Sequence, residues 1–313
     1  MLELMEFTKE LAKTMEEKLG SNFEVTEMET KKINMGKMVA LMIKDYTSAQ
    51  LVSPTFYVEP LYEVYRDEEE DIDTIADMIV TKYFEEVENN GVLEGLNDLC
   101  GLEWEAVKDR VTMQIVSYEK NAELLRDLPY IPFLDCVIVF SILVDQNDEH
   151  IRSIRITNSL AHNWNVELMD IFEAAKINTP QLYPIVFKKL SEVIFELMDV
   201  EEFEEAIKLP EEDLYVLSNK SNINGFTAIA YDGALDRASK VLQDNYYIIP
   251  SSIHEAILVP ESYGLSEEEL RQMVADVNGT VVAEEDRLSD EVYFYDRQKK
   301  QIVITKKGCE VNV

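Results

Sequence analysis

The sequence predicts an α+β fold, with antiparallel or mixed sheets and helices packed mainly on one face. Two observations lead to this prediction. In some segments apolar residues recur every three to four positions, the period of a helix, and in others they alternate with polar residues, the period of a strand. Several alternating segments follow each other across short polar turns, which favour antiparallel pairing. Their order predicts two subdomains, with repeats of strand, strand and helix in the second.

The first half of the chain begins with an amphipathic helix over residues 2–19, whose apolar residues share one face and which Gly20 can end. Those apolar residues are Leu4, Phe7, Leu11, Met15 and Leu19. Asn34-Met35-Gly36 is typical of a hairpin turn, and Pro54 restricts its strand to a sheet edge or a bend. The other elements expected before residue 120 are strands at 23–33, 38–46, 51–58 and 111–118, a long helix at 71–90 and a short helix at 104–109.

A connection punctuated by two prolines, Leu128–Pro132, separates the two halves. We place the domain boundary there. This gives an N-terminal α+β subdomain over 1–130, a C-terminal α+β subdomain over 131–305 and a tail over 306–313. In the second half we expect strands at 134–144, 151–157, 214–217, 226–231, 246–249, 255–259, 291–295 and 301–305, and helices at 166–177, 187–199, 232–243 and 266–277.

The charge of the chain excludes two classes of protein. It carries 29 Lys and Arg residues against 62 Asp and Glu residues, a formal net charge of −33. Proteins that bind nucleic acids or anionic membranes neutralise phosphates with basic residues, so we expect neither activity here. The acidic residues are distributed over the whole chain. Residues 1–150 contain 13 basic and 33 acidic residues, and residues 151–313 contain 16 basic and 29 acidic residues. Long-range attraction would favour a basic protein as partner.

The cysteines and the N-terminus favour a cytoplasmic protein. Cys100, Cys136 and Cys309 are an odd number at wide spacings, which is not typical of a disulfide framework or of a metal site. Cys136 lies in an apolar run and is expected to be a buried thiol. The N-terminus has no basic region before an apolar run, so we expect no signal peptide. The longest apolar stretch, Phe133–Val144, is too short for a membrane helix.

Motifs that identify common enzymes are missing. The 10 glycines form neither a dinucleotide-binding loop nor a phosphate loop, and no G-x-S-x-G elbow is present. His254-Glu255 is not followed by the second histidine that a zinc protease needs. We therefore predict no catalytic residue, no metal ligand and no cofactor, and we expect a protein that is not an enzyme.

One cluster keeps an enzymatic alternative open. A serine pair, a histidine and a carboxylate stand together at the turn between two apolar strands, and such groups support acid–base or nucleophilic chemistry. The structural alternative is that the serines stabilise the turn and that His254 donates to a backbone carbonyl. With two asparagines from neighbouring loops, the candidate binding cleft consists of Ser251, Ser252, His254, Glu255, Asn219 and Asn158.

Three hypotheses follow for the function. The first is an acidic protein that acts as a non-enzymatic protein-interaction module, because its carboxylates can steer a basic partner. A narrower form is a DNA mimic, or counter-defence inhibitor, that occupies the phosphate-binding channel of a basic nucleic-acid-binding protein. The simplest alternative to both of these is that the charge only keeps the protein soluble. The last hypothesis is an enzyme or small-molecule binder with a cleft near His254.

Several segments resemble an uncharacterised bacterial family, the domain-of-unknown-function family numbered 5688, which is common in gut Firmicutes. The segments are Ser53–Tyr57, Tyr118–Asp135, Asn178–Pro184, Leu214–Pro260 and Asp290–Arg297. The resemblance implies one unit of characteristic length from residue 1 to about 305, and it implies no activity. Members occur among mobile-element genes, which suits an interaction or counter-defence role.

Overall fold

The computed structural model describes residues 2–47, 55–88, 103–146, 151–197, 213–250, 252–280 and 282–305. It confirms the α+β fold, and all the strand pairings described are antiparallel. The chain divides into two compact units. The first consists of Met1–Val107 and Val144–Ser153, and the second of Lys108–Leu143 and Ile154–Val313. This division falls at 107/108, and the predicted boundary at 130/131 stays a prediction.

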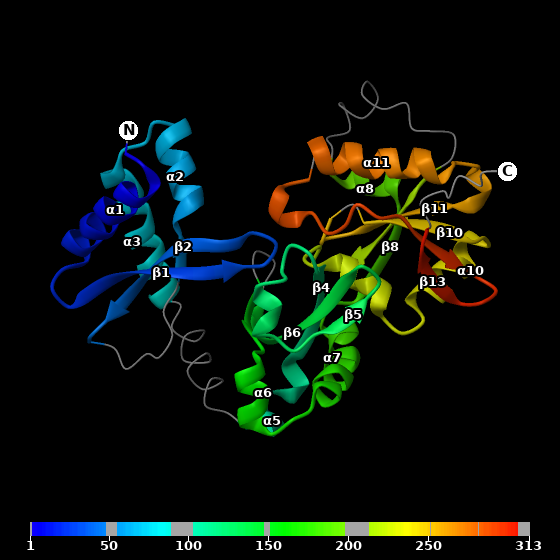
Figure 1. Ribbon diagram of the computed structural model, residues 1–313, viewed down its shortest axis with the longest axis horizontal. Helices are drawn as coiled ribbons and strands as arrows, with labels where there is room; N and C mark the ends of the chain where they lie inside the picture. Colours follow the sequence, from blue (N-terminus) through cyan, green and yellow to red (C-terminus); the bar gives the residue numbers. More distant parts are fainter. Residues whose placement is uncertain are drawn as a thin grey trace. The chain divides into compact units, whose positions relative to one another are not determined.

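The first unit contains a three-stranded sheet and its helices (Figure 1). The elements are α1 (Leu4–Leu19), β1 (Phe23–Lys32), β2 (Gly36–Asp45), β3 (Thr55–Tyr57), α2 (Val58–Asp67), α3 (Ile72–Glu88) and α5 (Trp104–Val107). The strands are ordered β1-β2-β3, and the pairing of Lys32 with Gly36 closes the predicted hairpin.

The core of the first unit lies between the helices and one face of the sheet. Phe7 and Leu11 of α1 and Leu41 and Ile43 of β2 are fully buried in one cluster with Ile75 of α3. Burying these side chains gains about 1.5–3 kcal/mol each relative to exposure. The helical period of α1 places its apolar residues on one side, and Leu41 and Ile43, two positions apart in β2, share one face of the sheet, so these faces can meet.

The middle of the chain forms a four-stranded sheet with two helices. The elements are η1 (Lys108–Arg110), β4 (Val111–Ser117), η2 (Leu124–Arg126), β5 (Ile131–Phe133), β6 (Cys136–Gln146), β7 (Ile151–Arg155), α6 (Asn158–Trp164) and α7 (Leu168–Leu182). Strand β6 is central, with β4 on one edge and both β5 and β7 paired to it. Phe140 of β6 packs against Phe172 of α7, with ring centroids 6.4 Å apart.

Side chains close the outer edge of β4. The N–H of Met113 donates to Thr179 Oγ1 at 3.0 Å, and the N–H of Ile115 donates to Thr227 Oγ1 at 3.1 Å. Asn178 Nδ2 donates to the carbonyl of Val111 at 3.1 Å. Exposed sheet edges invite further strands, whereas buried, unpaired amides are costly. The two threonines therefore stabilise β4 as an edge strand inside the second unit.

The rest of the second unit is a six-stranded sheet ordered β13-β12-β10-β11-β9-β8. The elements are β8 (Ile185–Lys189), α8 (Leu190–Leu197), β9 (Tyr215–Asn219), η3 (Gly225–Ala230), α10 (Ala234–Leu242), β10 (Tyr246–Ile249), β11 (Ala256–Pro260), η4 (Glu261–Tyr263), α11 (Glu267–Thr280), η5 (Glu284–Asp286), β12 (Tyr293–Asp296) and β13 (Gln301–Ile304). Leu270 and Val274 of α11 pack on Ile249, Val259 and Val292. Figure 1 shows α11 and α8 along one side of this sheet.

Several segments differ from the sequence prediction, and strand β5 and helix α6 were not predicted. Residues 226–231 form the 3-10 helix η3 and not a strand, because a short apolar run has no decisive period. Helix α7 continues to Leu182 through Pro180, which removes only the hydrogen bond that its own N–H would make to the carbonyl of Lys176. Residues 185–189 are strand β8, where a helix was expected from 187, and α2 was not predicted. Residues 51–54 of the expected third strand lie outside the described residues.

Replacing Thr227 by valine should destabilise the second unit by about 1–3 kcal/mol, because the buried N–H of Ile115 would lose its acceptor. The matched control is Thr26→Val on the exposed surface of β1, which should change the free energy of unfolding by less than about 0.5 kcal/mol. Urea unfolding followed by circular dichroism measures both. Equal losses for the two variants would contradict the role assigned to Thr227.

Buried tyrosines should make the second unit sensitive to alkali. Burial raises the pKa of Tyr183 to about 12 and also raises the pKa of Tyr231 and Tyr246. These phenols keep their protons in the folded state after the unfolded chain has lost them, so stability present below about pH 10 is lost above it. The melting temperature should fall as the pH passes about 10. Tyr231→Phe, which removes one of these phenols, should make the fall shallower, and an unchanged slope would refute this account.

Candidate functional site

The predicted cleft lies at one end of a strand pair in the second unit. Strand β9 ends at Asn219, and β11 begins at Ala256 and pairs with β9 in the register Ala256↔Leu217. Antiparallel pairing therefore places the loop after β9 beside the turn before β11. A hydrogen bond joins them: Ser218 Oγ donates to the carbonyl of His254 at 2.7 Å.

His254 has hydrogen-bond partners at both ring nitrogens. The backbone N–H of Asn224 donates to Nδ1 at 3.3 Å, and Nε2 lies 3.2 Å from Asp286 Oδ1. Because Nδ1 accepts, a neutral ring carries its hydrogen on Nε2 and donates it to Asp286. With both nitrogens engaged, the imidazole has no free position from which to take a proton from a substrate.

The serines and Glu255 belong to the turn itself. Ser252 is buried, its Oγ accepts from the N–H of His254 at 3.0 Å, and its own N–H lies 3.5 Å from the carbonyl of Glu255. This is the turn-stabilising role of the structural alternative. Ser251 lies outside the described residues. The neighbouring N–H of Ile253 donates to the carbonyl of Asp286 at 2.8 Å, so a second bond ties the turn to η5.

The two asparagines occupy different places. Asn219 is buried, donates from Nδ2 to the carbonyl of Ile223 at 2.8 Å and accepts from the hydroxyl of Ser221 at 2.8 Å, so it shapes its own loop. Asn158, at the start of α6, donates to the carbonyl of Arg126 at 3.2 Å. No hydrogen bond among the described residues joins Asn158 to the turn around His254. The six-residue cleft stays a prediction.

Gly225 explains how closely the two loops approach. A Cβ atom at this position would clash with Ser218 Oγ and with the carbonyl oxygen of His254, and would lie 2.9 Å from the N of Asn219. Only glycine leaves room for this contact. Phe226, the next residue, donates its N–H to the carbonyl of Ile253 at 3.1 Å. The glycine thus allows backbone bonds that fix the loop after β9 against the turn.

Two hydrogen-bonded carboxylates of the structure could not be predicted from local sequence patterns. Asp286 is 32 positions away from His254, and Asp135 meets residues more than 150 positions away. Ser289 Oγ and the hydroxyl of Tyr293 donate to the two oxygens of Asp135 at 2.6 and 2.7 Å. No local motif connects such distant residues. Only the apolar run that Asp135 interrupts could have marked this carboxylate as unusual.

Asp135 holds a strained turn in place. Leu134, in the two-residue turn between β5 and β6, has φ 57°, a conformation that bulky residues rarely adopt. Asp135 follows Leu134 in this turn, and the hydrogen bonds from Ser289 and Tyr293 hold it in place. Cys136 is buried, as expected, and burial raises the pKa of its thiol to about 12. A thiol with this pKa is a poor nucleophile at neutral pH, so the cluster stabilises the hairpin and offers no reactive group.

Within the ranges given above, no three His, Cys, Asp or Glu side chains are grouped so that they could hold a metal ion. None of the described helices combines the length and the apolar character that a membrane crossing requires.

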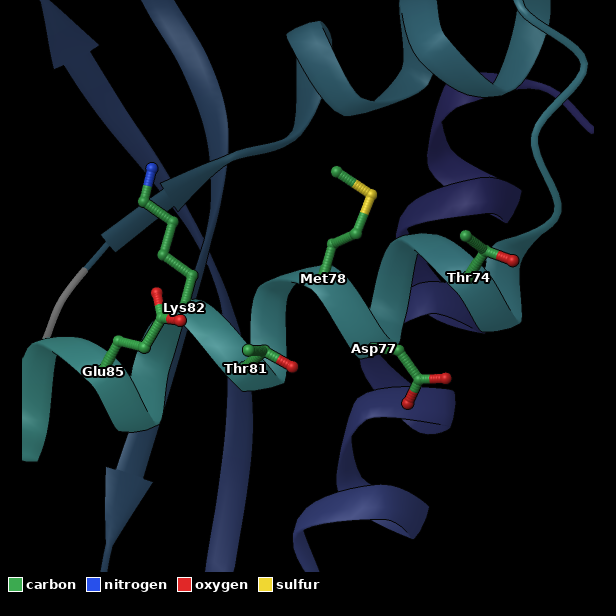
Figure 2. Close-up of a pocket in the computed structure, with 6 residues that line it drawn as sticks. All are labelled: Thr74, Asp77, Met78, Thr81, Lys82 and Glu85. Atoms are coloured by element: carbon green, nitrogen blue, oxygen red, sulfur yellow. The ribbon is translucent and has the colours of Figure 1, made fainter.

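Two shallow hollows lie on outward helix faces. Figure 2 shows the first, on α3, with Met78 at the centre of the face. Its lining residues, spaced by three and four positions, are Thr74, Asp77, Met78, Thr81, Lys82 and Glu85. Met78 is 57% exposed, so its apolar side chain is accessible among these charged and polar residues. The second hollow, on α8, is lined by Ser191, Glu192, Phe195 and Glu196.

Comparison with known proteins gives one match. The family described as "Family of unknown function (DUF5688)" matches residues 4–297, which confirms the resemblance inferred from the sequence. The match spans residues of both units, and its description assigns no activity. No curated protein and no solved structure matches the chain.

Gly225→Ala tests the close approach of the two loops. We expect a loss of about 1–3 kcal/mol in the free energy of unfolding, because the new methyl group meets the His254 carbonyl, which the strand pairing holds in place. The control is Gly279→Ala in α11, where a Cβ atom meets nothing within 4 Å and alanine should stabilise the helix. Thermal unfolding of both variants checks the prediction. A neutral Gly225→Ala variant would be inconsistent with it.

Proposed function

This chain belongs to the family of unknown function DUF5688, and we propose that it acts as a non-enzymatic protein-interaction module whose partner is a basic protein. The observation that carries the proposal is the outward face of α3. There Met78 is 57% exposed and shares the helix face with the carboxylates of Asp77 and Glu85 and the ammonium of Lys82, so these charged groups sum to −1 (Figure 2). An exposed apolar side chain among carboxylates fits a partner that is both apolar and cationic.

Methionine suits such a surface. Its unbranched, polarisable side chain adapts to different partners, and binders that recognise many sequences use surfaces of this kind. Met5 and Met35 of the first unit are also exposed, at 52% and 39%. The exposed methionines therefore supply apolar contact area without a rigid pocket.

The charge of the first unit supports a basic partner. Residues 1–107 and 144–153 together contain ten Lys and Arg residues against 28 Asp and Glu residues. Carboxylates in such excess attract cations over long distances at low salt and speed the encounter with a basic protein. The contact itself would still depend on apolar burial, since exposed ion pairs contribute only about 0–1 kcal/mol.

The alternatives have less support. An enzyme with a cleft at His254 would need a free imidazole nitrogen, and both nitrogens have hydrogen-bond partners. A DNA mimic needs rows of carboxylates spaced like phosphates, whereas the exposed face of α3 combines carboxylates with Met78 and Lys82. We therefore favour the broader interaction module over the mimic.

Met78→Lys tests the proposal. Lysine keeps the helix propensity but places a cation where a basic partner would dock. The probe is a helical peptide with one lysine-rich face and one leucine-rich face, and fluorescence anisotropy measures its affinity at about 50 and about 300 mM salt. We expect the variant to bind at least about tenfold more weakly at both concentrations, a change of ~1.4 kcal/mol.

The matched control is Val241→Lys, which adds the same charge at a 63% exposed position on α10. It should leave the affinity nearly unchanged. A similar loss in both variants would mean that only net charge matters, and it would refute a site on α3. No binding of the wild-type chain at low salt would refute the interaction with this class of partner.

A further inference from the structure

Strand β1 has an open edge whose direction can be derived from two hydrogen bonds. The N–H of Val25 donates away from β2, to Glu16 Oε1 of α1 at 2.9 Å. On β2, the N–H of Val39 donates away from β1, to Glu59 Oε1 at 2.7 Å, and Val39 is paired with Glu29. Directly opposite residues of an antiparallel pair both face each other or both face away. The odd-numbered residues of β1 therefore direct their N–H and C=O groups outward.

The open stretch is centred on Glu27 and Glu29. Glu16 already occupies the outward N–H of Val25, whereas no hydrogen bond among the described residues engages the backbone of Glu27 or Glu29 on this side. Both residues are exposed. Two outward residues offer two donors and two acceptors, which is the pattern that an added strand uses.

The side chains beside this edge determine what can add to it. Glu27 and Glu29 share one face, and Met28 lies between them on the other, exposed face. Residues placed directly opposite two carboxylates are favourable when they are cationic, and a residue opposite Met28 is favourable when it is apolar or β-branched. Glu29 already lies 2.8 Å from Lys37 Nζ, but this is an exposed ion pair that a second cation can share.

A second copy of the chain is less complementary to this stretch than a basic strand. Registers that align the acidic stretches of two copies place like charges directly opposite, which destabilises a sheet. Antiparallel registers that place Glu27 or Glu29 opposite Lys31 leave Glu29 opposite Glu29 or Glu27 opposite the turn residue Ile33. Charge at an edge is a common means of preventing such self-association. The same charge selects a basic strand, so complementarity specifies the occupant.

We propose that β1 binds an extended segment of a basic partner, in which Lys or Arg alternates with apolar or β-branched residues and which adds to the sheet at Glu27 and Glu29. This proposal rests on the proposed function, since it assumes a basic partner and adds a second binding surface and an extended conformation for the bound segment. Backbone hydrogen bonds hold the segment, and the alternation selects it.

The experiment uses the full chain and a nine-residue peptide in which lysine alternates with valine. Hydrogen exchange of individual amides, measured by NMR, reports on the site directly. On binding, the amides of Glu27 and Glu29 should exchange at least about tenfold more slowly, because they become hydrogen-bonded. The control peptide has the same sequence with N-methyl groups on alternate amides along one edge, so it keeps its charge and loses half of its donors. It should neither bind nor protect these amides.

Three variants separate the effect of charge from that of backbone pairing. Glu27→Pro removes an outward N–H that no internal bond uses, so the sheet should fold while peptide binding is lost. If this variant does not fold, the pair Glu27→Lys with Glu29→Lys keeps the backbone donors and should abolish binding by repulsion. Glu27→Thr keeps the N–H and should weaken binding only a fewfold.

The outcomes also distinguish the two proposals. Binding without protection of Glu27 and Glu29, or equal binding of the N-methylated peptide, would overturn strand addition and leave the proposed function standing. Failure of the alternating peptide to bind at all would also overturn strand addition. The proposed function is decided separately by the Met78→Lys comparison with the helical peptide.

Discussion

The hydrogen bonds along the outer edge of β4 are the constraint on which the second unit depends. The N–H groups of Met113 and Ile115 are buried, and an unpaired buried amide costs about 1–3 kcal/mol. Their acceptors, Thr179 and Thr227, are 66 and 112 positions away along the chain and come from α7 and η3. The edge is satisfied only after both elements have docked. The four-stranded sheet, α7 and the loop after β9 therefore form one packing arrangement.

The same requirement explains the polar residues that first suggested a binding cleft. Asn219, Ser252 and His254 all have hydrogen bonds with loop backbone, and Gly225 removes the side chain that would keep these loops apart. Loops packed against each other must satisfy their backbone groups internally, and small polar side chains do this well. Residue types that are common in active sites thus form hydrogen bonds here that connect the loops at the ends of neighbouring strands.

The carboxylates of the chain have two structural roles. Some carboxylates are internal partners, as Asp135 is for Tyr293 and Glu16 is for the backbone of Val25. Others, such as Glu27, are exposed beside unpaired backbone groups. Self-repulsion makes such a surface costly in stability, while it keeps copies of the chain apart. The acidic residues that disfavour self-pairing along β1 are the same residues that would select a basic strand.

The sequence alone determined the fold class, the amphipathic helix α1, the hairpin of β1 and β2 and the buried thiol of Cys136, because their signals are local: a period, a turn or an apolar run. Tertiary structure decided the rest. Residues 226–231 became the 3-10 helix η3 where Thr227 bonds to β4, and Asp286 reached His254 from 32 positions away. Whether the ring nitrogens of His254 have hydrogen-bond partners depends on residues that no local pattern contains, since hydrogen bonds between distant segments exist only once the chain has folded.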